Sequence, residues 1–159
     1  DALPICVIEQ LRRARPQAKF LELVHRLDKE TSGLLLLTDD GALLHQIISP
    51  KKHVAKRYLA TLDRPLQGHE AALFASGTLM LEREETPLLP AEMEVLSPTS
   101  ARLTLHEGRY HQVRRMFAAV GNHVEALHRS MIGTLTLGDL PEGEWRELTA
   151  DEIGQVILA

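Results

Sequence analysis

Residues 25–38 read His25-Arg26-Leu27-Asp28-Lys29-Glu30-Thr31-Ser32-Gly33-Leu34-Leu35-Leu36-Leu37-Thr38, a charged stretch that leads directly into the longest apolar run of the chain. This run has the length of a strand buried on both faces, whereas a membrane span needs about 20 apolar residues. Residues 20–24 are a second strand candidate just before the charged stretch. The charged stretch therefore connects two expected core strands, and such loops often carry catalytic groups.

Outward from this segment, local signals predict where helices begin and end. Asp39 or Asp40 suits the N-cap of a helix that ends at Ser49-Pro50. The clearest helix follows from apolar residues at i, i+3, i+4 and i+7 from Val113. Thr149, with a glutamate three residues later, forms a capping box for a last helix. The latter two helices are expected at 111–120 and 153–158, and further helices are expected at 5–15 and 68–75.

The strands outnumber the helices. They are expected over residues 20–24, 34–38, 55–62, 77–81, 90–96, 101–106, 123–127 and 134–137. In the strand at 101–106, apolar and polar residues alternate, which indicates one buried and one exposed face. Runs of strands interrupted by single helices predict an α+β fold with a mainly antiparallel sheet.

Composition predicts one ordinary globular domain. The 159 residues are 44% hydrophobic and 25% charged, enough for a sizeable core. Cys6 is the only cysteine, so we expect no disulfide and a reducing, cytoplasmic setting. The eight histidines lack metal-ligand spacing, and there is no glycine-rich phosphate or dinucleotide loop. The sequence thus predicts neither a metal site nor a cofactor.

The net charge of −4 argues against a general nucleic-acid binder, but the charge is unevenly distributed. Residues 1–64 carry 11 Lys and Arg against 8 Asp and Glu, and residues 65–159 carry 7 against 14. Local basic clusters suit phosphate contacts, although solvated surface charge is the preferred explanation of each cluster when it is read alone. Two of these clusters comprise Lys51, Lys52, Lys56 and Arg57, and Arg109, Arg114, Arg115 and Arg129.

Two polar segments are candidates for chemistry. Asp28 lies in the charged connection described above, where the alternative is an ordinary loop with Asp28 paired to Arg26 or Lys29. The second segment, residues 107–115, enters the helix at 111–120 with Arg114 flanking the apolar stripe. Cations near a helix N-terminus oppose the helix dipole, and such local conflicts are often functional. An exposed basic helix start is the alternative for this segment.

Three segments together resemble the bacterial pseudouridine synthases of the RsuA/RluA superfamily. His25-Arg26-Leu27-Asp28 with Thr31-Ser32-Gly33-Leu34-Leu35 is similar to the signature loop of that superfamily. Lys56-Arg57-Tyr58 resembles its second motif, and residues 107–117 resemble its third. All three motifs occur in the expected order. Within the superfamily, Thr38-Asp39-Asp40-Gly41 and the Tyr-His-Gln form at residues 110–112 are similar to RsuA-type members that act on small-subunit rRNA.

Two features depart from the RsuA-type pattern. His25 and Thr31-Ser32-Gly33 are closer to the RluA branch, since RsuA-type members commonly have Gly at the first position. RsuA-type members also carry an N-terminal S4 RNA-binding domain and an opening strand with a Lys-Pro motif. Neither is present here, so we expect residues 1–159 to be a catalytic domain that lacks its N-terminal strand and S4 domain.

The resemblance implies a pseudouridine synthase fold, with helices around a mainly antiparallel mixed sheet and an active-site cleft across it. It implies isomerisation of a uridine in rRNA, uridine 516 of 16S rRNA in the first instance, by a monomer that binds no membrane. The open alternatives are a 23S rRNA or tRNA target, a catalytically silent RNA-binding module, and an unrelated protein-interaction domain.

The resemblance also assigns roles. Asp28 is the catalytic nucleophile or base, since one ionised carboxylate can attack C1′ or remove a proton from C2′. Arg114 is the ion-pair partner of Asp28, and Tyr58 stacks on the flipped uracil and assists proton removal at C5. RNA contacts are implied for Arg26, Lys51, Lys52, Lys56, Arg109, Arg115 and Arg129.

Overall fold

The structure is a computed structural model that describes residues 22–24 and 26–157. The helix predicted at 5–15 and His25 lie outside the described residues. Among the helices of the described part, none is long and apolar enough to cross a membrane.

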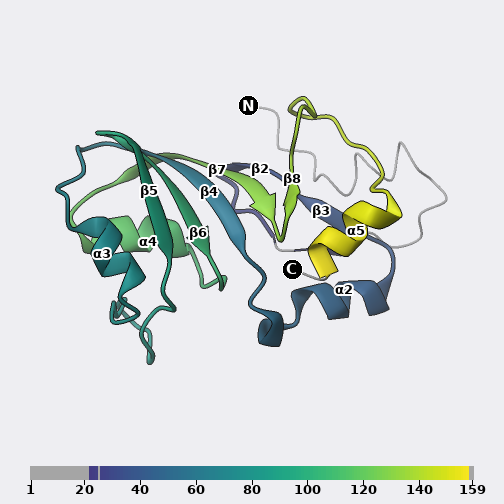
Figure 1. Cartoon of the computed structure of the whole chain (residues 1–159), viewed down its shortest axis with the longest axis horizontal. Coiled ribbons are helices and arrows are strands. Elements are labelled where there is room, and N and C mark those ends of the chain that lie inside the picture. Colours follow the sequence, from purple (N-terminus) through teal and green to yellow (C-terminus); the bar gives the residue numbers. More distant parts are fainter. Residues whose placement is uncertain (1–21, 25, 158–159) are drawn as a thin grey trace.

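A six-stranded mixed sheet forms the centre of the molecule (Figure 1). Its order is β2-β7-β4-β6-β5, and β8 pairs with β7. The β2–β7 pair is parallel and the other pairs are antiparallel. The strands are β2 (Thr31–Gly33), β4 (Lys56–Leu62), β5 (Glu92–Ser97), β6 (Ser100–Leu105), β7 (Val124–Ile132) and β8 (Leu135–Thr136). A separate antiparallel pair joins β1 (Glu22–Val24) and β3 (Leu36–Thr38), and the predicted α+β class is confirmed.

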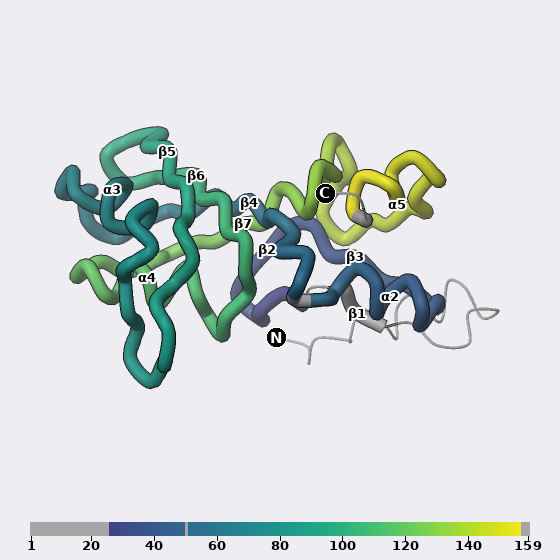
Figure 2. The backbone as a smooth tube through the Cα atoms, turned by 60° about the horizontal axis from the view of Figure 1, so that its bottom comes forward, coloured from purple at the N-terminus to yellow at the C-terminus, as the bar shows by residue number. Residues whose placement is uncertain are grey.

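The helices lie at the two ends of the molecule (Figures 1 and 2). At one end, α3 (Glu70–Ala75) contacts β5 and α4 (Gln112–Ala119) contacts β7. At the other end, α2 (Gly41–Ile48) and α5 (Ala150–Ile157) contact each other. A 3₁₀ turn, Pro50–Lys52, follows α2.

The predicted caps are confirmed. The carboxylate of Asp40 accepts hydrogen bonds from the backbone N–H groups of Ala42 and Leu43. Thr149 and Glu152 form the reciprocal capping box. Gly121, with φ +78°, closes α4 in a Schellman arrangement with hydrogen bonds to the carbonyls of the last turn.

Two apolar cores fill the two ends. In the larger, the predicted alternation on β6 is confirmed, because Ala101, Leu103 and Leu105 are all buried. The smaller packs α2, α5 and β3 around Ile132 and Leu135. Strand β7 contributes Val124 and Leu127 to the first core and Ile132 to the second, so this strand links both.

Four expectations for strands differ from the structure. The strand expected over 34–38 is the shorter β3, in which Leu37 and Thr38 are only half-buried, so it is not buried on both faces. Residues 77–81 form a turn and a loop, in which Leu81 is buried without a ladder partner among the described residues. The strand expected over 123–127 extends to Ile132. Residues 31–33, expected in a loop, form β2 instead, because Thr31–Gly33 pairs with a segment almost a hundred residues away. Such pairing leaves no signal in the local pattern.

Candidate active site

A pocket of about 330 Å³ lies over the face formed by β4, β6 and β7. The connection at residues 26–31 and the segment 107–114 complete its walls. Asp28, Tyr58 and Arg114, predicted from three separate motifs, line this one pocket together with Arg26. The volume lies at the small end of the usual range for ligand sites, about 300–1,000 Å³.

Strand β4 supplies two polar side chains to the floor. Lys56 and Tyr58 are two residues apart, so they share one face of the strand. The register of β4 with β7 shifts between Arg57 and Tyr58, which places Arg129 opposite Tyr58. A β-bulge of this kind redirects a side chain, and here it brings the guanidinium of Arg129 into the pocket beside Tyr58.

Arg129 is only 1% exposed and ties β7 to the connection that carries Asp28. Its Nε and one Nη donate to the carbonyl of Leu34 at 3.0 and 2.9 Å, and the other Nη donates to the carbonyl of Arg26 at 3.5 Å. Burial lowers the pKa of Arg129, and the hydroxyl of Tyr58 and the charge of Asp28 oppose that change. The guanidinium of Arg129 is enclosed in the fold, and the phosphate contact expected of it stays a prediction.

Lys56 is the second buried cation, 7% exposed. Burial, reinforced by the charge of Arg129 and opposed by Glu107, lowers the pKa of Lys56 to about 8. Lys56 lines the pocket, and the phosphate contact expected of it likewise stays a prediction. The two buried cations, Lys56 and Arg129, therefore line the same pocket as the carboxylate of Asp28.

We expect Lys56→Met to stabilise the protein at pH 7 by roughly 3 kcal/mol, because the pKa of Lys56 falls from 10.5 to about 8 on folding and each pKa unit is worth about 1.4 kcal/mol. The folded chain binds fewer protons than the unfolded chain between those pH values. The cost of burying the ammonium is thus complete below pH 8 and fades towards pH 10.5. Urea unfolding at pH 7 and pH 10 measures this difference.

Lys51→Met is the matched control for Lys56→Met. Lys51 is exposed in the 3₁₀ turn, so this variant should change the free energy of unfolding by less than about 0.5 kcal/mol at either pH. If Lys56→Met were no more stable than wild type at pH 7, or its gain did not shrink at pH 10, burial of a costly cation would be refuted.

Asp28 lies at the wall of the pocket with its side chain 39% exposed. Its Oδ1 is 3.5 Å from Nε2 of His111. The backbone carbonyl of Asp28 accepts a hydrogen bond from Thr31, which fixes the turn before β2. His111 was not predicted as a site residue. The available signal was its place between the turn at Gly108 and the apolar stripe of α4, where it adopts a left-handed backbone conformation.

The side chain of Arg114 contacts the backbone of the connection that carries Asp28. Its guanidinium donates to the carbonyl of Glu30 at 3.1 Å and to that of Val124 at 3.3 Å. Within residues 26–157, no ion pair joins Arg114 to Asp28, and His111 lies closest to that carboxylate instead. The expected Asp28–Arg114 ion pair is therefore not formed in this structure, and Arg114 holds the loop that carries Asp28.

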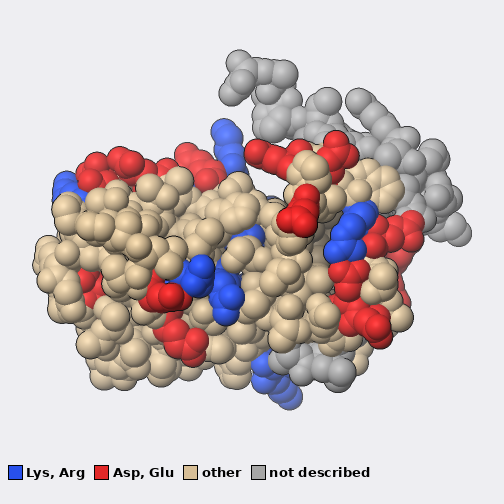
Figure 3. Space-filling view, turned by 45° about the horizontal axis from the view of Figure 1, so that its top comes forward, with Lys and Arg blue, Asp and Glu red and all other residues tan. Residues whose placement is uncertain are grey.

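The other predicted RNA contacts fall into two groups. Arg109 donates to the carbonyls of Thr86 and Pro87, and Arg115 donates to the carbonyl of Glu82, so both brace the loop before β5. Arg26, Lys51 and Lys52 are exposed. The face drawn in Figure 3 carries basic and acidic groups side by side, without one continuous basic surface.

The chemistry available in the pocket centres on one carboxylate. Glu107, the other acid in the lining, is occupied by Arg109, Gln112 and the backbone of Leu89. Among the described residues, no group of three or more His, Cys, Asp or Glu side chains could hold a metal ion. The residues present suit a reaction on a neutral ring that needs a nucleophile or base, a hydroxyl and fixed positive charge.

Comparisons with known proteins agree with the motifs. A family model described as RNA pseudouridylate synthase matches residues 7–119. The chain is 52% identical over 143 residues to the ribosomal small subunit pseudouridine synthase A of Escherichia coli strain K12, covering 89% of this chain. It is 48% identical to the protein of the same name in Haemophilus influenzae, with the same coverage of this chain. The chain spans 62% and 61% of the lengths of these two relatives.

Solved structures give the same picture. A crystal structure of a pseudouridylate synthase superposes with a TM-score of 0.82 at 50% identity, covering 86% of this chain and 59% of that one. The human RNA pseudouridylate synthase domain containing 1 superposes with a TM-score of 0.59 at 20% identity, covering 95% of this chain and 84% of that one, and shows the fold alone. The chain therefore belongs to the RNA pseudouridylate synthase family, in its RsuA-type branch.

Proposed function

We propose that this chain isomerises a uridine in rRNA to pseudouridine, with uridine 516 of 16S rRNA as the target and Asp28 as the catalytic residue. The observation that carries the proposal is the meeting of Asp28, Tyr58 and Arg114 in one pocket, although 86 residues of chain separate the first from the last. The names of the bacterial relatives support an rRNA substrate in the small subunit.

The reaction is balanced without any added reagent. The bond from uracil N1 to C1′ breaks, a bond from C5 to C1′ forms, the proton of C5 is lost and N1 gains a proton. Asp28 acts as nucleophile at C1′ or as base at C2′, and it remains partly exposed so that a ribose can reach it. The target base must first leave its stack, which costs a few kcal/mol.

The remaining pocket residues orient the base and bear charge. Tyr58 stacks on the uracil ring, and its hydroxyl, which hydrogen-bonds to Arg129, assists proton removal at C5. The buried cations Lys56 and Arg129 stabilise negative charge that develops on the detached uracil. Arg114 acts as a positioning residue through the carbonyl of Glu30. Arg26, exposed beside the pocket, contacts the RNA backbone or fills the space left by the flipped base.

The test is tritium release from 16S rRNA labelled at C5 of uridine, followed by mapping of pseudouridine. We expect release with a single new modification at uridine 516. Release with a modification elsewhere would keep the reaction and refute the target. RNA binding without release would instead indicate a silent binding module. Absence of any salt-dependent RNA affinity in filter binding would refute an RNA-directed function altogether.

A further inference from the structure

Tyr110 presents its ring to solvent beside the pocket. It is 76% exposed, more than any other large hydrophobic side chain of the described residues. A single exposed apolar side chain is common on protein surfaces and carries no conclusion by itself. The residues around this ring, however, give it a defined position close to Asp28.

The ring of Tyr110 is stacked on the imidazole of His111. The ring centroids are 3.9 Å apart and the planes differ by 16°. His111 in turn lies 3.5 Å from the carboxylate of Asp28, and all three residues line the pocket. One face of the Tyr110 ring is thus covered by His111, and its exposure leaves the other face open. The two stacked rings therefore extend from the contact with Asp28 to solvent.

The backbone around Tyr110 is held in place. Arg115 donates to the carbonyl of Tyr110 at 3.0 Å. The N–H of Arg109 donates to the side chain of Gln112 at 3.0 Å, and Gln112 is buried. An aromatic group fixed before binding loses little conformational entropy when a ligand stacks on it. This segment therefore suits recognition of a flat ring.

Resting on the proposed function, we propose that the open face of Tyr110 stacks on a nucleobase adjacent to the flipped uridine, and that this contact helps to select the target. Proteins read single-stranded RNA by stacking unpaired bases on aromatic side chains. A nucleotide next to a flipped base loses one stacking partner, and Tyr110 lies one ring beyond the group that contacts Asp28. The ring of Tyr110 therefore takes the place of the lost stacking partner.

A double-mutant cycle between protein and RNA tests this contact. The protein arm compares two proteins that both carry Asp28→Asn, one with Tyr110 and one with Tyr110→Leu. Because Asp28→Asn prevents conversion of the uridine, filter binding reports affinity alone. The RNA arm compares a synthetic 16S rRNA segment centred on uridine 516 with versions carrying one abasic nucleotide, either at position 516 or at a flanking position. We expect Tyr110→Leu to weaken binding of the intact RNA roughly tenfold, in line with base–aromatic stacking.

The proposal predicts that the effect of Tyr110→Leu on affinity is coupled to removal of one flanking base. At one flanking position, removal of the base should weaken binding by the protein that retains Tyr110. The same removal should cause no further loss of affinity in the Tyr110→Leu variant, because the stacking partner is already gone. Equal losses on intact and abasic RNA at every flanking position would overturn the contact. Coupling of the Tyr110→Leu effect to base removal at uridine 516 alone would also overturn the proposal, because Tyr110 would then stack on the target base itself.

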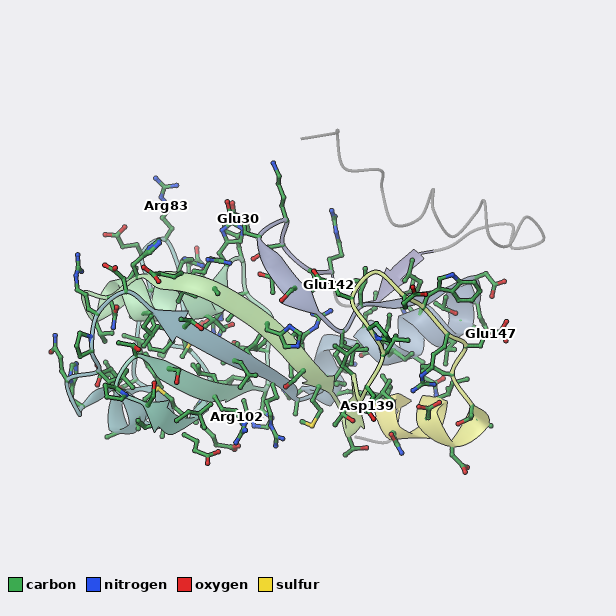
Figure 4. All side chains as sticks on the ribbon, turned by 90° about the horizontal axis from the view of Figure 1, so that it is seen from above. Glu30, Arg83, Arg102, Asp139, Glu142 and Glu147 are labelled. Carbon is green, nitrogen blue, oxygen red and sulfur yellow. The ribbon has the colours of Figure 1, made fainter. Side chains whose placement is uncertain are left out.

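Two controls complete the experiment. Tyr110→Phe keeps the ring and should rescue most of the affinity. Trp145→Leu removes another exposed aromatic, from the loop that carries Glu142 and Glu147 at the opposite end of the molecule from Arg83 (Figure 4), and should not alter binding. Failure of the proposed function is detected separately, as absence of tritium release by the wild-type chain.

Discussion

Asp28→Asn is expected to lower the rate of pseudouridine formation by a factor on the order of 10³ or more, because an amide is neither a nucleophile nor a base for this reaction. The substitution keeps the shape of the side chain. Asp28 is partly exposed and its carboxylate lies 3.5 Å from the imidazole of His111, so stability should change by less than about 1 kcal/mol. Single-turnover tritium release and urea unfolding measure the two effects separately.

Asp139→Asn is a control for the loss of one negative charge. Asp139 is exposed and lies at the other end of the sheet from Arg83 (Figure 4), outside the pocket lining. This variant should turn over as fast as wild type. Near-normal turnover by Asp28→Asn would falsify the assignment of Asp28, whereas an unfolded Asp28→Asn protein would show that the carboxylate stabilises the fold.

Gly33→Ala is expected to cost at least about 3 kcal/mol of stability, the range seen when a side chain is forced against a fixed backbone. Gly33 has φ +114°, and a Cβ added there would lie 2.1 Å from the carbonyl oxygen of Arg129. Neither backbone can move freely, because Gly33 and Arg129 are partners in the parallel pairing of β2 with β7. Thermal unfolding monitored by circular dichroism measures the loss.

Gly41→Ala provides the comparison within the same chain. Gly41 begins α2, and a Cβ added there meets nothing within 4 Å. Alanine also favours the helix, so this variant should match wild type or exceed its stability by up to about 1 kcal/mol. Equal melting temperatures for Gly33→Ala and Gly41→Ala would contradict the close approach of β2 to β7.

Much of the fold was predictable from local signals. The caps at Asp40 and Thr149 depend on residues three or fewer positions apart, and the alternation on β6 reflects burial of one strand face. The pairing of β2 with β7 was not predictable in this way. Three residues that look like part of a charged loop become a strand only because Arg129 and its neighbours lie beside them.

The candidate site likewise combines features that the local sequence predicts with features that depend on tertiary packing. Asp28, Tyr58 and Arg114, which were singled out by three separate motifs, line one pocket, and their catalytic roles stay predictions. The strand period of two also implied that Lys56 shares the face of Tyr58, and this inference was missed. Burial of Arg129 and the contact of His111 with Asp28 depend on a bulge and on a left-handed residue, which are set by tertiary packing.

The bond from Arg129 to the carbonyl of Leu34 spans 95 residues of chain, and this separation has a kinetic consequence. Bringing such distant segments together costs loop-closure entropy before any contact is gained, so contacts of this kind form slowly. We expect the β5–β6 hairpin to form first, the β4–β6 ladder after it and the Asp28 connection to dock last. In pulse-labelled hydrogen exchange during refolding, the amide of Leu34, which donates to the carbonyl of Arg129, should gain protection after the amides of β4 and β6.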